Sequence, residues 1–310
     1  MKSKRILVTG GAGFVGTRLV SLLLKEGFFV RVLDNFIYNQ VVFLDILDNS
    51  NFELIKGDLR NEDIVRKSLE DIDLIVHMAA IVGAPKCDND PQLAIEVNLQ
   101  AAKNLDKLRK SIPIIYISTG SVYGKLDEIC TEESPVNPFT IYSKTKYDFE
   151  KVVKESGNFI IFRPATAFGV SSRMRTDLLI NDLTFMAIKK GKIVLFEPSA
   201  RRTFIHVLDF ARAIAHAINH FDSMKNNIYN IGDEKMNLTK KHVAELIKKH
   251  VDYELELSEE GEDPDKRDYE VSYEKFKNTS FRTTISVEDG IISLLKCYQI
   301  IEDRNFSNRD

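Results

Sequence analysis

The stretch Arg5–Gly16, RILVTGGAGFVG, decides the fold. It begins with a short, mostly apolar run that is typical of a buried strand and continues into a glycine-rich turn. Gly11, Gly13 and Gly16 satisfy the pattern G-x-G-x-x-G, and with Gly10 in place of Gly11 the wider pattern G-x-x-G-x-x-G is satisfied as well. Glycines here permit a tight turn, close approach of the backbone to a pyrophosphate, and close packing of a helix on a strand. The stretch therefore predicts a strand–turn–helix unit that binds a dinucleotide.

The helix of this unit is expected at Phe14–Lys25, where apolar residues recur at helical spacing. The first backbone N–H groups of a helix have no partner within it, and the helix dipole is positive at this end. We therefore expect Phe14 and Val15 to contact the phosphates of the bound dinucleotide.

Asp34 ends the next predicted strand, Phe29–Asp34, and lies 18 residues after Gly16. A carboxylate in this place accepts the hydroxyl groups of an adenine ribose and repels a 2′-phosphate, which favours NAD over NADP. Asn35 is a further candidate for cofactor contact, and no arginine directly follows Asp34 to hold a 2′-phosphate. The alternative for Asp34 is a turn-forming aspartate.

Asp58 and Leu59 follow a third predicted strand, Phe52–Lys56. They are further candidates for cofactor contact, with Asp58 placed to reach the adenine amino group. The alternative for Asp58 is a place near the N-terminus of a helix.

Short apolar runs alternate with helical patterns through the first half of the chain. Several of the strands are apolar throughout, which is typical of a parallel sheet covered on both faces. The predicted class is α/β, a doubly wound parallel sheet (Rossmann fold) with a smaller C-terminal α/β substrate lobe. Strands are expected at 5–9, 29–34, 52–56, 72–77, 112–118 and 159–163, and helices at 14–25, 61–69, 91–109 and 139–155.

The alternation loosens after Pro164. Here we expect helices at 176–190, 207–220, 239–249 and 287–298, strands at 192–196, 227–231 and 253–257, and a charged loop at 258–268. The expected domains are an NAD-binding domain at 1–165, to which 205–231 returns, a substrate lobe made of 166–204 and 232–300, and a frayed tail at 301–310.

The composition narrows the class of protein. A chain of 310 residues that is 44% hydrophobic can bury a large core, and a net charge of −3 gives no basic footprint for nucleic acid. Its apolar runs are too short for a membrane span or a signal peptide. Cys87, Cys130 and Cys297 are scattered, so they predict neither disulfides nor a metal site. We expect a cytoplasmic protein.

Tyr142 and Lys146 lie four residues apart in TIYSKTK, which places both side chains on one face of a predicted helix. A free tyrosine has a pKa near ~10, and a nearby ammonium lowers that pKa by favouring the phenolate. Such a tyrosine can take a proton from a hydroxyl group and return it. Thr119 follows the fifth predicted strand at the sheet edge where open α/β folds bind ligands, so its hydroxyl is a candidate donor to the reacting oxygen.

The motifs TGGAGFVG, GDLR, HMAA, ISTGSVYG, YSKTK and FRPATAFG occur in this order, with Asp34 and Asn98 in their places. By these motifs and their order, the chain resembles the NAD-dependent nucleotide-sugar epimerases and dehydratases, which belong to the extended short-chain dehydrogenase/reductase family. The resemblance covers nearly the whole chain. The resemblance implies that Tyr142 is the acid and base of the reaction. Lys146 would be its partner and would also hold the nicotinamide ribose, and Thr119 would donate to the reacting oxygen.

The same resemblance implies roles for residues around the reacting groups. His77, Ala79 and Ala80 would line the cofactor cleft, and Pro164 would pack on the nicotinamide. Asn98 would support the catalytic geometry from its helix.

RRTFIHVLDFARAI resembles the family segment R-x-F-x-H-V-x-D, which implies that Arg202 binds the diphosphate of a nucleotide sugar. Asn181 matches an asparagine that relatives use near the diphosphate, and Ser121 would contact the substrate beside the catalytic threonine. Arg267 is a second phosphate candidate, with a solvated charged loop as the alternative.

A finer resemblance rests on SSRMRTDLLINDLTF and GEDPDKRDYEVS, which are similar to a branch that includes GDP-heptose 4-dehydrogenases. That branch departs from the V-Y-G signature that this chain keeps at Val122–Gly124. Whether Arg173 and Arg175 face the substrate is left open at this point.

Family 4,6-dehydratases carry an Asp-Glu pair after the catalytic threonine, where this chain has Gly120 and Ser121. Without that acid and base, elimination of water has no agent. We therefore expect an epimerase that oxidises and re-reduces a sugar hydroxyl at C4, in a homodimer formed through the helices at 91–109 and 139–155. The alternatives are a 4-dehydrogenase or ketoreductase and, from another class, a non-catalytic NAD sensor.

Overall fold

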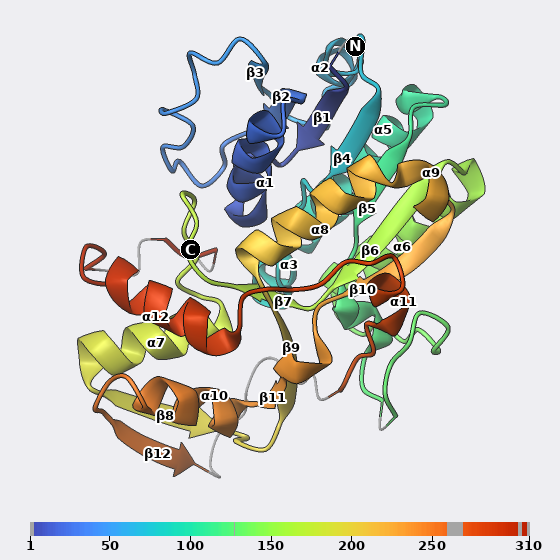
Figure 1. The fold of residues 1–310 in the computed structure, drawn as a ribbon. Helices are drawn as coiled ribbons and strands as arrows, with labels where there is room; N and C mark the ends of the chain where they lie inside the picture. The colour runs from blue at the N-terminus through green and yellow to red at the C-terminus, as the bar shows by residue number, and fades with distance from the viewer. Residues whose placement is uncertain (1–2, 127, 259–268, 303–305, 309–310) are drawn as a thin grey trace.

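The computed structural model describes residues 3–126, 128–258, 269–302 and 306–308. Its centre is a seven-stranded parallel sheet in the order β10-β6-β5-β4-β1-β2-β3 (Figure 1). The predicted α/β class is thereby confirmed. The strands are β1 (Arg5–Thr9), β2 (Phe29–Asp34), β3 (Phe52–Lys56), β4 (Leu74–His77), β5 (Ile114–Ile117), β6 (Phe159–Pro164) and β10 (Asn227–Ile231).

Helices cover both faces of this sheet, because its strands are apolar on both sides. Along β1, Ile6 and Val8 join one buried cluster and Leu7 joins another, as the alternation of side chains across a strand requires. The first cluster includes α1 (Phe14–Lys25) and α8 (Val207–Asn219), and the second includes α2 (Glu62–Ser68), α5 (Ala102–Arg109) and α6 (Ile141–Ser156).

The predicted long helix at 91–109 is divided in the structure. It consists of α4 (Pro91–Ile95), a π-helical segment (Glu96–Ala101) and α5. The wider π turn contains Asn98, whose amide is buried and bonded to both backbone groups of Ile81. A short helix that the sequence did not predict, α3 (Ala84–Asn89), precedes α4.

The smaller lobe has its own apolar core and two small sheets, ordered β11-β9-β7 and β12-β8. In Figure 1 it lies beyond the carboxyl ends of the central strands. Residues 259–268, which are all of the predicted charged loop except its first residue, lie outside the described residues. The elements of the smaller lobe are β7 (Thr166–Phe168), α7 (Leu179–Lys190), β8 (Lys192–Phe196), β9 (Arg201–His206), β11 (Asn237–Thr239), α10 (Lys240–Lys248), β12 (Glu254–Ser258) and α12 (Val287–Cys297). Two further short helices, α9 (Phe221–Met224) and α11 (Glu274–Lys277), pack with the central sheet.

The sequence predicts a frayed tail at 301–310, but part of this tail is packed in the structure. The backbone N–H of Thr176 donates to the Phe306 carbonyl at 3.0 Å, and Asn308 is 5% exposed. Residues 306–308 therefore pack against the segment that follows β7. Within the described ranges, no helix is long and apolar enough to cross a membrane.

A buried carboxylate fastens α6 to the carboxyl ends of β5 and β6. Glu150 is fully buried and accepts hydrogen bonds from Arg163 Nε at 3.1 Å and Arg163 Nη2 at 2.7 Å. It also accepts a short hydrogen bond from the Ser118 hydroxyl. Arg163 further donates to the Tyr123 hydroxyl at 3.3 Å. One carboxylate thus joins α6 to the ends of β5 and β6, next to Thr119 and Pro164.

We predict that Glu150→Gln lowers the free energy of unfolding by about 3–5 kcal/mol, because a buried guanidinium loses its counter-charge. Urea denaturation of the cofactor-free protein measures this. The matched control is Glu245→Gln on α10, whose carboxylate is 55% exposed and 3.8 Å from Lys241. The control is expected to cost less than about 1 kcal/mol. Equal losses in the two variants would contradict the importance given to this ion pair.

Candidate active site

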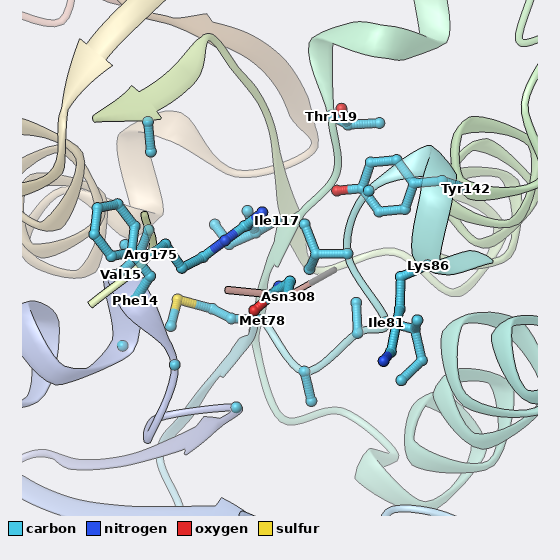
Figure 2. Close-up of a pocket in the computed structure, with 18 of the residues that line it drawn as sticks. Phe14, Val15, Met78, Ile81, Lys86, Ile117, Thr119, Tyr142, Arg175 and Asn308 are labelled. Atoms are coloured by element: carbon cyan, nitrogen blue, oxygen red, sulfur yellow. The ribbon is translucent and has the colours of Figure 1, made fainter. Parts of the chain in front are cut away.

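A cleft of about 470 Å³ opens where the central strands end and the smaller lobe begins. This volume lies within the ~300–1,000 Å³ that is usual for sites that bind small molecules. Its walls come from the turns after β1, β2, β4, β5 and β6 and from Arg202 and Phe204 of β9. Figure 2 shows Thr119 and Tyr142 on one side of the cleft, and Phe14 and Val15 across from them.

The glycine turn packs tightly enough to explain why it needs glycines. Gly10 has a φ of +72°, and a Cβ on it would lie 2.6 Å from the Ala79 backbone nitrogen. A Cβ on Gly16 would lie 2.5 Å from the Gly11 carbonyl oxygen, so α1 could not start this close to the strand. Gly13 also lines the cleft, whereas Gly11 faces the Val32 side chain instead. The wider glycine pattern is therefore the one that shapes the cleft.

Asp34 is held by the turn around it. One of its oxygens accepts from the Ala12 N–H at 3.0 Å and the other from the Phe36 N–H at 2.8 Å. Burial raises the pKa of this carboxyl, and those backbone donors oppose the rise. Asn35 also lines the cleft. The carboxylate therefore keeps one orientation at the edge of the cleft.

Asp58 and Leu59 line the same end of the cleft. Arg60, which sequence reasoning missed as a partner, donates to Asp58 from Nε at 3.0 Å and from Nη2 at 2.9 Å. These bonds lower the pKa of Asp58 and keep it charged. Together with the glycine turn and Asp34, these residues fit a dinucleotide.

Tyr142 and Lys146 reach the cleft from the first two turns of α6. Thr140 caps this helix, because its hydroxyl accepts from the Ser143 N–H at 3.1 Å and the Ser143 hydroxyl accepts in return from the Thr140 N–H. The cap fixes where the helix begins and so how Tyr142 points. Figure 2 shows the Tyr142 phenol directed into the cleft.

Lys146 is 3% exposed, and its ammonium lies 4.5 Å from the centre of the Tyr116 ring. Burial lowers the pKa of this lysine to about 7, and the charge of Glu150 one turn further along the helix opposes the shift. Thr119 is 7% exposed and its hydroxyl accepts from the Ser121 N–H at 3.1 Å, at the start of a 3₁₀ turn at Gly120–Tyr123.

Asn98 connects two walls of the site. Its side-chain oxygen accepts from the Ile81 N–H at 2.7 Å, and its amide donates to the Ile81 carbonyl at 3.0 Å and to the Thr145 hydroxyl at 3.4 Å. Ile81 lines the cleft and Thr145 lies between Tyr142 and Lys146 on α6. The buried amide therefore holds the cofactor wall against the helix that carries the reacting groups.

Two of the residues that the sequence predicts at the site do not line the cleft. Ala79, Ala80 and Pro164 line the cleft, but His77 does not: its ring packs on Tyr116 and its Nδ1 bonds the Thr9 hydroxyl at 2.7 Å. The side chain follows the alternation of β4 toward the face of the sheet that α6 covers, where its ring also contacts Phe149.

Asn181 does not reach the cleft either. It is fully buried, exchanges hydrogen bonds of 2.9 and 3.0 Å with the backbone of Gly169, and donates to the Arg175 carbonyl at 2.8 Å. It braces the segment after β7. Arg202 and Ser121 do line the cleft, while Arg267 lies outside the described residues.

We predict that Lys146 makes a contribution to the stability of the cofactor-free protein that rises with pH above about 7, because the unfolded chain then binds more protons at position 146 than the folded one. Lys146→Met removes this contribution. Relative to the wild type, the variant should therefore be most stable near pH 6.5 and lose its advantage toward pH 10. Urea denaturation at a series of pH values measures the difference.

The control for this experiment is Lys144→Met, which changes an exposed lysine on the same helix. Its stability difference from the wild type should stay constant with pH. A pH-independent difference for Lys146→Met would contradict a buried ammonium at this position.

Comparisons with known proteins agree with this geometry. A putative UDP-glucose 4-epimerase from Methanocaldococcus jannaschii is 27% identical over 243 residues, 74% of this chain and 77% of the relative. UDP-glucuronic acid decarboxylase 1 from Xenopus tropicalis is 24% identical over 303 residues, 93% of this chain and 70% of the relative. The crystal structure of UDP-glucuronic acid 4-epimerase from Bacillus cereus, in complex with UDP-glucuronic acid and NAD, matches with a TM-score of 0.83 and 26% identity, covering 95% of this chain and 99% of that one.

The model of one family, described as the NAD dependent epimerase/dehydratase family, matches residues 6–232. This region contains the glycine turn, Asp34, Thr119, Tyr142 and Lys146, each at the cleft. The chain belongs to the NAD-dependent epimerase/dehydratase family, and it is an enzyme of the extended short-chain dehydrogenase/reductase type whose cofactor is NAD.

Proposed function

We propose that this protein is a nucleotide-sugar epimerase that inverts a sugar hydroxyl at C4. The observation that carries the proposal is the placing of Thr119, Tyr142 and Lys146 in one cleft with the glycine turn and Asp34. A sugar that binds in this cleft would have Tyr142 as its proton acceptor, next to the residues that hold the cofactor.

Tyr142 takes the proton of the sugar hydroxyl and later returns it. The Lys146 ammonium favours the phenolate form of Tyr142 by its charge, and Thr119 donates a hydrogen bond that holds the reacting oxygen. NAD, when bound, supplies hydride uptake and return. Arg202, which is 4% exposed and lines the cleft, is the residue proposed to bind the substrate diphosphate with its planar guanidinium.

The structure also supports an epimerase over a 4,6-dehydratase. A Cβ on Gly120 would lie 3.1 Å from the Pro164 carbonyl oxygen and 3.3 Å from the Tyr269 hydroxyl. A carboxylic acid at position 120 would therefore have to displace its neighbours to enter the site. Ser121, the next residue, has no acidic group either, so elimination of water lacks its acid and base.

The direct test is to incubate the protein and NAD with UDP-, dTDP- and GDP-linked hexoses and to identify the products by NMR spectroscopy. We predict a C4 epimer without net formation of NADH. Release of a 4-keto sugar with stoichiometric NADH would instead assign the 4-dehydrogenase, and no conversion of any nucleotide sugar would contradict the proposal.

We predict that Tyr142→Phe lowers the turnover rate by about 10²–10⁴-fold, because the general acid and base is lost. Binding of NAD, measured by calorimetry, should change little. Tyr147→Phe is the matched control, since this half-exposed tyrosine lies on the same helix outside the cleft and contacts Lys151. Equal activity of the two variants would remove Tyr142 from the mechanism.

A further inference from the structure

The segment between β7 and α7, residues 169–178, crosses from the smaller lobe to the start of α1. The Ser171 hydroxyl donates to the Phe14 carbonyl at 2.7 Å and shares a 2.7 Å hydrogen bond with the Thr17 hydroxyl. Arg18 donates twice to the Val170 carbonyl, at 2.9 and 2.7 Å. These bonds hold the segment against the first turns of the helix whose N–H groups face the cleft.

Two arginines of this segment, Arg173 and Arg175, line the cleft. Arg175 forms a bidentate ion pair with Asp177, in which Nε donates to one carboxylate oxygen at 3.1 Å and Nη2 to the other at 2.6 Å. Its charge is therefore balanced by a carboxylate of the same segment. Figure 2 shows the Arg175 side chain extending from the side of Phe14 and Val15 toward the middle of the cleft.

Arg173 differs, because no carboxylate lies within ion-pair distance of it in the part of the chain that the structure describes. It is 2% exposed, its guanidinium lies 4.1 Å above the Tyr38 ring, and it donates a short hydrogen bond to the Asn308 side chain. Its Nε is buried and has no hydrogen-bond partner among the described residues, and the same holds for the Tyr38 hydroxyl.

A buried guanidinium that has no carboxylate in direct ion-pair contact is costly to the folded state. Burial lowers the pKa of Arg173 to about 10, and the charge of Arg175 adds to this shift, while the charges of Asp177 and Asp34 oppose it. Such an arrangement is complete only when an anion joins it.

The position of Arg173 indicates which anion this is. Tyr38, on which it stacks, follows Asp34 by four residues, and Asp34 is the carboxylate expected to hold the adenine ribose. The segment that carries Arg173 is bonded to the start of α1, whereas Thr119 and Tyr142 lie on the opposite side of the cleft. The site therefore faces the cofactor and not the reacting sugar.

We propose that Arg173, with Arg175 beside it, binds the pyrophosphate of the dinucleotide from the side of the smaller lobe, opposite the N–H groups of α1. The cofactor's phosphates then join the two lobes, and the smaller lobe contributes to cofactor affinity as well as to substrate binding. This inference rests on NAD as the cofactor and is independent of which reaction follows.

The test compares two ligands that differ in the pyrophosphate. We predict that Arg173→Gln weakens the binding of ADP-ribose by about 10- to 100-fold, because a charge-assisted hydrogen bond and a counter-charge are lost. Binding of adenosine should be unchanged. Calorimetry gives the first affinity and NMR titration the second, weaker one. Arg66→Gln, at an exposed arginine of α2, is the control and should leave both unchanged.

Arg173→Lys covers the case in which the glutamine variant does not fold. It keeps the charge and loses the fork of donors, so its ADP-ribose affinity should fall between those of the wild type and Arg173→Gln. An equal loss for adenosine and ADP-ribose, or no loss for either, would overturn the proposal. Weakened binding of UDP or GDP with unchanged ADP-ribose binding would overturn it too, by assigning the arginine to the substrate. Loss of ADP-ribose affinity would support it even if no nucleotide sugar is epimerised.

Discussion

The buried contact between Glu150 and Arg163 is the constraint on which the catalytic geometry depends. Tyr142, Lys146 and Glu150 follow one another at intervals of four residues along α6, so fixing the last of them fixes the stripe that carries the other two. Glu150 is bonded to Arg163 and to Ser118, the residues before Pro164 and Thr119. A single carboxylate therefore sets the helix against both strand ends that enter the cleft, and its charge also favours the protonated form of Lys146.

The second constraint is the closeness of α1 to its own strand. Because Gly10, Gly13 and Gly16 have no side chains, the helix begins directly behind the turn and its N–H groups open into the cleft. The smaller lobe then completes the site from the other side, through the segment 169–178 that is bonded to α1. Cofactor binding, in this account, is a property of both lobes.

Sequence reasoning recovered the parts that follow from local pattern. The apolar runs predicted the strands of the central sheet, and spacing predicted Tyr142 and Lys146 on one helical face. It did not predict β9, because its RRTFIH sequence mixes charged and apolar residues, yet all but its first residue are buried. The orientation of Asn181 depends on the path of residues 169–178, to which its side chain is bonded. The spacing of residues in the sequence does not predict that path. The sequence does not place Arg173 for the same reason, since its partner Asn308 is 135 residues away.

In the proposed epimerisation, a hydrogen leaves C4 of the sugar and returns to the same carbon, while Tyr142 moves only the proton of the hydroxyl group. The most direct measurement is to supply a converted nucleotide sugar with deuterium at C4 in ordinary water and to record the NMR spectrum of the product. We expect an epimer that keeps its deuterium at C4. An epimer with hydrogen from water at C4 would contradict this mechanism, because the carbon would then have been deprotonated rather than oxidised.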